Sequence, residues 1–399
     1  MPLQPYRDVL RRPGVPSSLL LMFAVRLPMT ATGITMTLHV VTELGRGYGA
    51  AGLVGAMTTG GTALGAPLVG RFIDAHGLRP VIAACAITSA AYWLTAPHLP
   101  YSVLLFTALP AGMLAIPAGP VGKQILAALI PESQRRSAFS LDSMSVELSF
   151  MAGPALGVAI ATTSSGTAAL SAIGVAFGVG GAALWIVNPP IRNAEEVRRD
   201  GAPRPRLRDW VSRPLVATWI TAFGALFVLV GTEIAVLAAL RASGDVEFTG
   251  LVITIMCAVS VVGGVVHGAV RRPLSQRTLM FLLAVLVIPV AWLDQPWWVL
   301  ALALIPTNVA CAPTLAATAE SVSSLAPPQV RGTAMGFQDA ASRLGIAAGN
   351  PAIGLVIDAS APSWGFAASG LVGIAVAVVA VALISTATAT TKRGSLSPG

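Results

Sequence analysis

The sequence has 399 residues, of which 55% are hydrophobic and only 11% are charged, and its mean hydropathy is +0.76. A soluble domain carries roughly 25% charged residues, so this composition excludes a protein whose main solvent is water. The net charge of +8 does not indicate nucleic-acid binding, because the arginines are scattered over short loops and only 4 tyrosines are present to stack on bases.

After a short arm at 1–16, apolar runs follow one another along the chain. Crossing a bilayer takes about 20 helical residues at 1.5 Å per residue, and these runs have about that length. We therefore expect an all-α membrane protein with 12 transmembrane helices. The predicted spans are 17–40, 48–70, 79–97, 100–124, 138–161, 166–187, 214–240, 248–270, 277–294, 297–321, 333–357 and 363–385.

The basic residues collect in alternate loops. With the N-terminus inside, 21 of the 25 basic residues fall on the cytoplasmic side and only Arg46 and Arg241 fall in outside loops. This bias predicts that both termini are cytoplasmic. Lys123 and Lys392 are the only lysines, a usage typical of GC-rich genomes, so we expect a multi-pass protein of a bacterial cytoplasmic (inner) membrane. The first apolar run lacks a cleavage site for a signal peptidase and is expected to be retained.

A charged, proline-rich stretch lies at the midpoint of the chain. It predicts an N-terminal six-helix bundle at 1–187, a cytoplasmic linker at 188–213, and a C-terminal six-helix bundle with a short tail at 214–399. The halves are related in sequence at an offset of 196, which becomes 197 after a one-residue insertion. The matching pairs include Pro110 and Pro306, Pro117 and Pro313, Arg135 and Arg331, Asp142 and Asp339, and Pro154 and Pro351.

A charged turn joins the second and third predicted spans. Gly70 permits close helix contact, Gly77 supplies the positive φ of a tight reversal, and Asp74 can dock on a neighbouring helix N-terminus or an arginine. With Arg79 after them, these residues have the spacing that resembles the signature loop of the major facilitator superfamily. Two of the family's usual arginines are absent from this loop. The resemblance implies two pseudo-symmetric bundles, alternating access, and a substrate site between the halves near the bilayer midplane.

Gly153, Pro154 and Gly157 in the fifth span resemble the motif of facilitator drug antiporters, with Ser149 and Val158 in place of flanking glycines. The proline kinks the helix, and we expect the glycines to pack against the opposite bundle. A generic proline kink is the other interpretation.

Charge inside a bilayer is expensive, so buried ionisable residues are functional candidates. The candidates for proton coupling are Arg26, Glu147, Glu233 and Arg343. Arg26 and Glu147 lie at similar depths and are expected to pair, either for coupling or as a structural ion pair. Glu233 lies nearer the outer face, so its depth does not favour a pair with Arg343.

Asp142 and Asp339 lie near the starts of their spans. One interpretation is that each acid stabilises a helix N-terminus. The resemblance implies the other, a cytoplasmic gate in which Asp74 and Arg79 meet the start of span 11 near Asp339, with Gly70 and Gly77 shaping the turn.

The resemblance also implies that spans 1, 4, 7 and 10 line the cavity. Methionine and aromatic side chains on these spans are also common in protein cores and facing lipid. A mostly apolar cavity would suit amphiphilic or aromatic substrates. The candidate cavity residues are Thr30, Met36, Met113, Trp219, Phe223 and Asn308.

The leading hypothesis is a proton-coupled transporter that exports drugs or metabolites. The alternatives are a proton symporter that imports a sugar or other small nutrient, and a non-transporting membrane scaffold. We expect that the protein is not an enzyme and holds no cofactor or metal. Its histidines and cysteines lack the spacing of metal ligands, and the sequence contains no phosphate-binding loop. The expected partners are a small-molecule substrate, protons and the lipid bilayer, without nucleic acid, and the expected state is a monomer.

Overall fold

The computed structural model describes residues 4–193, 205–270 and 272–394, and these ranges are helical without a β-strand. The long helices are α2 (Val15–Thr42), α3 (Tyr48–His76), α4 (Leu78–Thr95), α7 (Arg135–Thr163), α8 (Gly166–Val187), α11 (Arg213–Ser243), α12 (Thr249–Ala269), α17 (Arg331–Ala359) and α18 (Pro362–Gly394). The shorter helices are α1 (Gln4–Leu10), α5 (Tyr101–Met113), α6 (Ala118–Leu129), α10 (Leu207–Trp210), α13 (Gln276–Val287), α14 (Trp297–Ala303), α15 (Ile305–Val309) and α16 (Cys311–Leu325). The 3-10 turns are η1 (Ala96–His98), η2 (Glu132–Gln134), η3 (Val246–Phe248), η4 (Ile288–Trp292) and η5 (Pro328–Val330).

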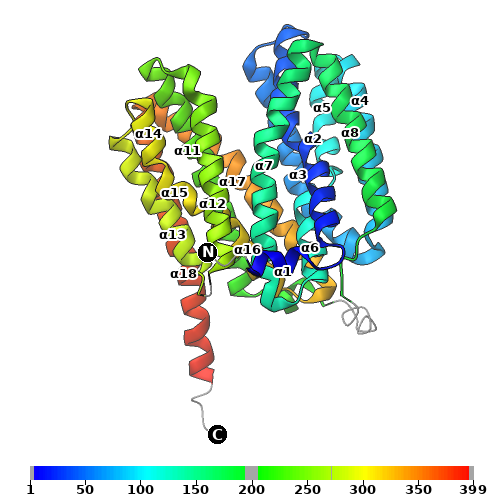
Figure 1. Cartoon of the computed structure of the whole chain (residues 1–399), viewed down its shortest axis with the longest axis vertical. Coiled ribbons are helices and arrows are strands. Elements are labelled where there is room, and N and C mark those ends of the chain that lie inside the picture. Colours follow the sequence, from blue (N-terminus) through cyan, green and yellow to red (C-terminus); the bar gives the residue numbers. More distant parts are fainter. Residues whose placement is uncertain (1–3, 194–204, 271, 395–399) are drawn as a thin grey trace.

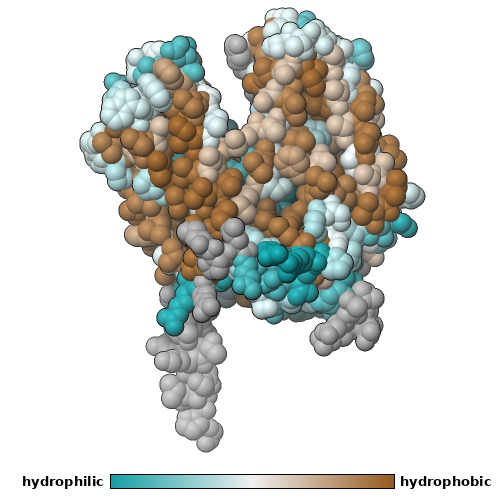
Figure 2. Space-filling view, in the orientation of Figure 1, coloured by the Kyte–Doolittle hydropathy of each residue, from teal (hydrophilic) through white to brown (hydrophobic). Residues whose placement is uncertain are grey.

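The twelve predicted spans are all present as helices, and the chain is a multi-pass membrane protein. Ten helical segments among the described residues are long and apolar enough to cross a membrane by length and composition. The other two predicted spans are α3, and α13 continued by η4. Large apolar side chains such as Leu20, Phe106 and Leu355 are at least 69% exposed, which suits contact with lipid rather than water. Brown apolar surface covers the sides of both lobes in Figure 2.

Helices α2 to α8 form one bundle and α11 to α18 form the other (Figure 1). Each bundle has its own apolar core. One core is built from residues between Met22 and Ile191, and the other from residues between Ala225 and Ala377. The predicted linker is described only at its two ends, because 194–204 lie outside the described residues; its second end contains α10, where Trp210 is buried.

The internal repeat reappears in the shapes of the helices. The fourth predicted span is broken between α5 and α6, and the tenth is broken into α14, α15 and α16. Helices α7 and α17 both follow a 3-10 turn and begin at the repeat partners Arg135 and Arg331. The sequence predicts spans 4 and 10 as continuous helices, and the structure breaks both; discontinuous helices at equivalent places are typical of transporter binding sites.

The two bundles meet at one end of the molecule and separate at the other. Figure 2 shows an open cleft between the two lobes at the top, which we call the open end. At the other end, the closed end, α1 lies across the gap between the lobes and α18 extends beyond them (Figure 1). The predicted N-terminal arm is therefore partly helical.

Candidate functional site

Arg26 on α2 is paired with Asp142 on α7 rather than with Glu147. The Arg26 Nη2 and Asp142 Oδ1 atoms are 2.7 Å apart, and the two side chains are 6% and 2% exposed. The expected Arg26–Glu147 pair is therefore wrong. Depth alone predicted it, but Asp142 is also deep in the helix, because α7 begins at Arg135 and not at 138.

Asp339, the repeat partner of Asp142, is held differently. Its Oδ2 accepts a hydrogen bond of 2.8 Å from Arg343 Nε, one turn further along α17. Both aspartates lie about two turns inside their helices, beyond the first turn where the helix dipole stabilises an acid. Lys123 on α6 interacts electrostatically with both Asp142 and Asp339 and so links the charges of the two halves.

Glu147 connects the two bundles. Its carboxylate accepts a hydrogen bond of 2.8 Å from Ser260 on α12, and the thiol of Cys311 on α16 lies 3.4 Å from the same oxygen. The Ser260 hydroxyl also accepts a 3.1 Å bond from the backbone N–H of Ala312, which positions it between the two helices. Glu147 on α7 therefore contacts two helices of the second half of the chain, α12 and α16.

Glu233 on α11 is exposed and lies close enough to Glu147 for the two carboxylates to repel each other. The structure thus brings together two of the four candidates for proton coupling, Glu147 and Glu233. The other two candidates form ion pairs elsewhere: Arg26 pairs with Asp142, and Arg343 pairs with Asp339.

The acid of the signature loop fastens α3 to the start of α17. The two oxygens of the Asp74 carboxylate accept bonds from the backbone N–H groups of Gly332 (3.0 Å) and Thr333 (2.7 Å), and the Thr333 hydroxyl adds a third bond of 2.7 Å. Free N–H groups at a helix start attract an anion, so Asp74 docks on an N-terminus of the opposite bundle. We call this contact, made by Asp74 with Gly332 and Thr333, the α3–α17 latch.

Glycines shape the latch as their positions suggest. A Cβ at Gly70 would collide with the carbonyl oxygen of Gly332, so a glycine permits the two helices to approach here. Gly77 has φ +83° between α3 and α4, where a side chain would strain the backbone.

Arg79 and Asp339 lie outside the latch. The Arg79 Nε donates a 3.2 Å bond to the carbonyl of Trp185 at the end of α8, and its guanidinium lies over that indole ring. The expectation that Arg79 meets span 11 near Asp339 is therefore wrong. The Arg79 side chain contacts its own bundle. Among the four motif residues, Asp74 is the one whose side chain bonds to the opposite bundle.

A second contact at the closed end was not foreseen from the sequence. The Tyr6 hydroxyl on α1 lies 2.8 Å from the carbonyl oxygens of Gly264 and Val265 on α12. On α7, the Ser137 hydroxyl donates a 2.8 Å bond to Gly268 of α12. Burial raises the pKa of Tyr6 to about 12, so its hydroxyl remains a donor across the physiological range. The signal for this contact, one tyrosine in a polar arm, is too weak to read from a single sequence.

The antiporter-like kink packs within its own bundle. A Cβ on Gly153 would collide with the Thr30 hydroxyl, and one on Gly157 would lie 2.5 Å from the hydroxyl of Thr35; both threonines are on α2. Pro154 lies inside α7. The expectation that these glycines face the opposite bundle is therefore wrong.

The six candidate cavity residues are dispersed. Met36 and Asn308 are each 4% exposed, and the Asn308 amide donates to the carbonyl of Leu304, the residue that precedes α15. Trp219 donates a 3.2 Å bond to the Ala334 carbonyl and packs against Phe337 in the closed end.

The other three candidates are half-buried. Thr30 spans α2 and α7 through a 2.8 Å bond to the Ser149 carbonyl. Met113 ends α5 beside Gly65, and Phe223 packs its ring against Phe227. The role of these six residues in a substrate cavity stays a prediction.

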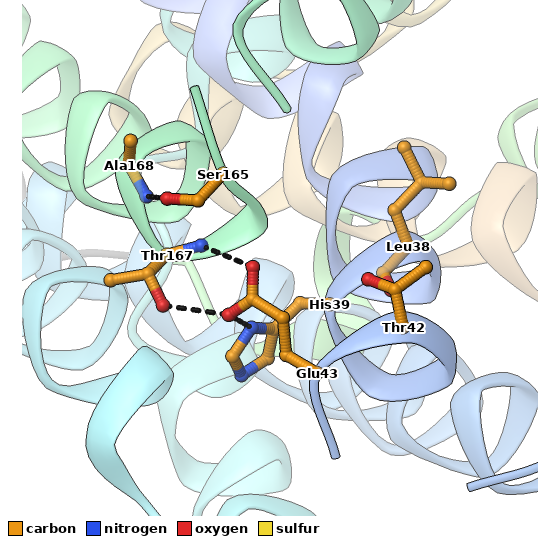
Figure 3. Close-up of polar contacts among 7 residues, drawn as sticks. All are labelled: Leu38, His39, Thr42, Glu43, Ser165, Thr167 and Ala168. Carbon is orange, nitrogen blue, oxygen red and sulfur yellow. Dashed lines mark hydrogen bonds and ion pairs between the residues drawn. The ribbon is translucent and has the colours of Figure 1, made fainter. Parts of the chain in front are cut away.

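At the open end, Glu43 joins α2 to α8 (Figure 3). Its carboxylate accepts bonds from the backbone N–H (3.1 Å) and hydroxyl (2.7 Å) of Thr167 and lies 2.9 Å from the Nδ1 of buried His39. Partial burial by itself raises the pKa of Glu43, but the bonds from Thr167 and the nearby His39 outweigh it, so the pKa lies below its ordinary value. Glu43 caps the N-terminus of α8, a role that was not predicted from the sequence.

Comparisons with known proteins agree with this architecture. The family described as the Major Facilitator Superfamily matches residues 18–294 and 234–398. No curated protein sequence shows a significant match. Similarity to solved structures is widespread, and three of them illustrate it.

The human organic anion transporter MFSD10 (TETRAN) is similar with a TM-score of 0.70 and 16% identity over 92% of this chain and 100% of that one. The proton:xylose symporter XylE gives a TM-score of 0.69 and 13% identity, over 91% and 94% of the two chains. A bacterial homologue of the iron transporter ferroportin, in an outward-facing state, gives a TM-score of 0.72 and 16% identity, over 93% of this chain and 98% of that one. These identities show a shared fold. Together with the family match, they establish that the chain belongs to the Major Facilitator Superfamily and is a secondary transporter.

Proposed function

We propose that this transporter is coupled to protons, that it works by alternating access, and that Glu147 takes up and releases the proton. The observation that supports this proposal is the position of Glu147: it is an ionisable group deep in α7 whose hydrogen-bond donors, Ser260 and Cys311, belong to the other bundle. Such a group inside a membrane is a functional candidate by default.

Protonation would weaken this contact between the bundles. An ionised carboxylate accepts strong, charge-assisted hydrogen bonds, whereas a protonated one has lost part of that capacity. Opening the closed end requires α7 to part from α12 and α16, which now meet at Glu147. Proton uptake at Glu147 therefore favours separation of the bundles there, and proton release favours the arrangement described above.

We propose further that transport is export of small organic compounds across a bacterial inner membrane, by a monomer with both termini in the cytoplasm. Export rather than import is supported by the kink at Gly153, Pro154 and Gly157, which resembles the motif of facilitator drug antiporters. A proton symporter that imports a sugar or other nutrient is the competing function, and its support is the similarity in fold to a proton:xylose symporter.

Proton movement in liposomes tests this proposal. The purified protein is reconstituted with a pH-sensitive dye in the lumen, and cationic, neutral and anionic organic compounds are added in turn. We expect compounds that are substrates to alkalinise an acid-loaded lumen, which establishes antiport and identifies the substrate class. Acidification of the lumen after addition of an external compound would indicate symport, and a response independent of the pH gradient would contradict proton coupling.

A further inference from the structure

A basic pocket lies at the closed end, beside the α3–α17 latch. It has a volume of about 510 Å³ and draws its walls from the end of α3, the segment 205–210 and the start of α17. Its lining residues are Pro67, Leu68, Arg71, Asp74, Pro205, Arg206, Leu207, Trp210, Gln329, Val330, Thr333 and Phe337. One pocket thus involves both bundles and the second end of the predicted linker.

The charges of this basic pocket favour an anion. The side chains of Arg71 and Arg206 are exposed, and neither forms an ion pair among the described residues. The acid in the lining, Asp74, has both carboxylate oxygens occupied by the N-terminus of α17. Nearby Asp209 accepts a bond of 3.0 Å from the backbone N–H of Arg206 and forms no ion pair with its guanidinium among the described residues. Two exposed arginines that have no ion-pair partner among the described residues suit the binding of a phosphate group.

The apolar side of the pocket leads into the membrane. Leu64 and Leu68 precede Arg71 by seven and three residues, so the three side chains lie on one face of α3. Leu64 is 61% exposed and Leu68 is 48% exposed. Arg71 lies just beyond the end of the predicted span 48–70. Trp210 and Phe337 add aromatic walls at the same level.

We propose that the basic pocket binds an anionic phospholipid of the leaflet at the closed end. The phosphate contacts Arg71 and Arg206, and an acyl chain lies along Leu68 and Leu64. Basic pockets at the cytoplasmic ends of membrane helices are known to bind such headgroups, and the arginine distribution predicts that this end is cytoplasmic. Because the lining belongs to both bundles, the lipid holds them together beside the latch and stabilises the conformation with a closed end.

Lipid titrations of the purified full-length protein in detergent test this inference. We expect dioleoyl phosphatidylglycerol to raise the unfolding midpoint above that obtained with dioleoyl phosphatidylcholine by about 2–4 °C. Native mass spectra should retain the anionic lipid preferentially. The double variant Arg71→Gln and Arg206→Gln should lose the difference between the lipids, and the same positions changed to lysine should keep most of it.

The matched control is the double variant Arg11→Gln and Arg208→Gln, which removes the same charge from exposed positions at the closed end outside the pocket. It should respond to the anionic lipid as the unmodified protein does. Equal effects of the two lipids on the unmodified protein would overturn the inference, as would an undiminished response in the pocket variant. The same rise with inorganic phosphate alone would identify a free anion as the ligand and would also overturn it. If the pocket double variant does not fold, Arg206→Gln in its exposed segment should still lose at least half of the response.

Discussion

Arg26 on α2 and Asp142 on α7 form an ion pair of 2.7 Å in which the side chains are only 6% and 2% exposed. In the second half, the repeat partner of Asp142 is Asp339, which pairs with Arg343 on its own helix at 20% and 24% exposure. The same repeated acid therefore ties two helices together in one bundle and stays within one helix in the other. A buried pair is costly to break from one side, whereas a partly exposed pair along one helix contributes little.

This difference predicts unequal effects of the same substitution. Asp142→Asn leaves the guanidinium of Arg26 buried without its counter-charge and should cost about 3–5 kcal/mol of stability. Asp339→Asn, the matched control, should cost about 0–1 kcal/mol because Arg343 remains partly solvated. Thermal unfolding of both variants in one detergent measures the difference. Equal losses would contradict the structural role given to the Arg26–Asp142 pair.

The sequence predicted the fold well and the partners of charged residues poorly. Long apolar runs and arginine placement are signals summed over many residues, so the number and approximate bounds of the spans could be predicted. The docking of Asp74 on a helix N-terminus could also be predicted, since a glycine-bounded turn with one acid has few alternatives. The partner of Arg26 depends on where α7 begins and how it is rotated, and a shift of three residues in the helix start was enough to select the wrong acid.

Close packing at the latch predicts a strong effect of one methyl group. Gly70→Ala places a Cβ against the Gly332 carbonyl, so α3 and α17 must separate. Overpacking of this kind costs typically about 1–3 kcal/mol. The control is Gly60→Ala in the same helix, where a Cβ meets open space and a gain of up to about 1 kcal/mol in helix propensity is expected. Unfolding midpoints of the two variants should move in opposite directions, and a neutral Gly70→Ala would refute the close approach.

The three hydrogen bonds to Asp74 predict a shift in the conformational equilibrium. Asp74→Asn removes the charge that holds the start of α17, and hydrogen bonds to charged groups contribute about 1.5–3 kcal/mol each. We expect the closed end to open at least about tenfold more often. Thr333→Val, which removes only the hydroxyl bond, should have a smaller effect.

Spin labels at exposed positions His76 and Ser324, one in each bundle, report this opening as a longer distance across the closed end. The labelling requires replacement of Cys85, Cys257 and Cys311. Distance distributions that are the same in Asp74→Asn and the parent protein would show that the α3–α17 latch does not control the closed end.

The lowered pKa of Glu43 predicts a specific pH dependence. Its contacts with Thr167 stabilise the folded protein fully above the ordinary pKa of 4.5 and are lost as the pH falls through the lower folded-state value. Glu43→Gln should therefore lower the unfolding midpoint at neutral pH, and the gap to the unmodified protein should narrow below about pH 4.5. Scans from pH 7 down to the lowest pH at which the protein stays folded measure this gap. A gap that is constant with pH would show that the charge of Glu43 contributes nothing.

The proposed role of Glu147 predicts the loss of coupling without the loss of the fold. Glu147→Gln keeps an acceptor for the Ser260 hydroxyl but cannot exchange a proton, so substrate-dependent proton flux should fall to the level of empty liposomes. Binding of the substrate should persist, since the change preserves size and packing. Unchanged flux under a pH gradient would exclude Glu147 as the coupling acid.

Two controls separate coupling from damage. Glu320→Gln removes an acid of α16 that lines a pocket to which Glu147 does not belong, and it should leave proton flux unchanged. Ser260→Ala removes the donor that stabilises ionised Glu147, and loss of such a bond disfavours the charged form. Proton flux in this variant should therefore persist, with its pH profile moved to higher pH. A variant that is inactive at every pH would instead assign Ser260 a structural role, and an unmoved profile would show that the bond between the bundles does not tune the proton site.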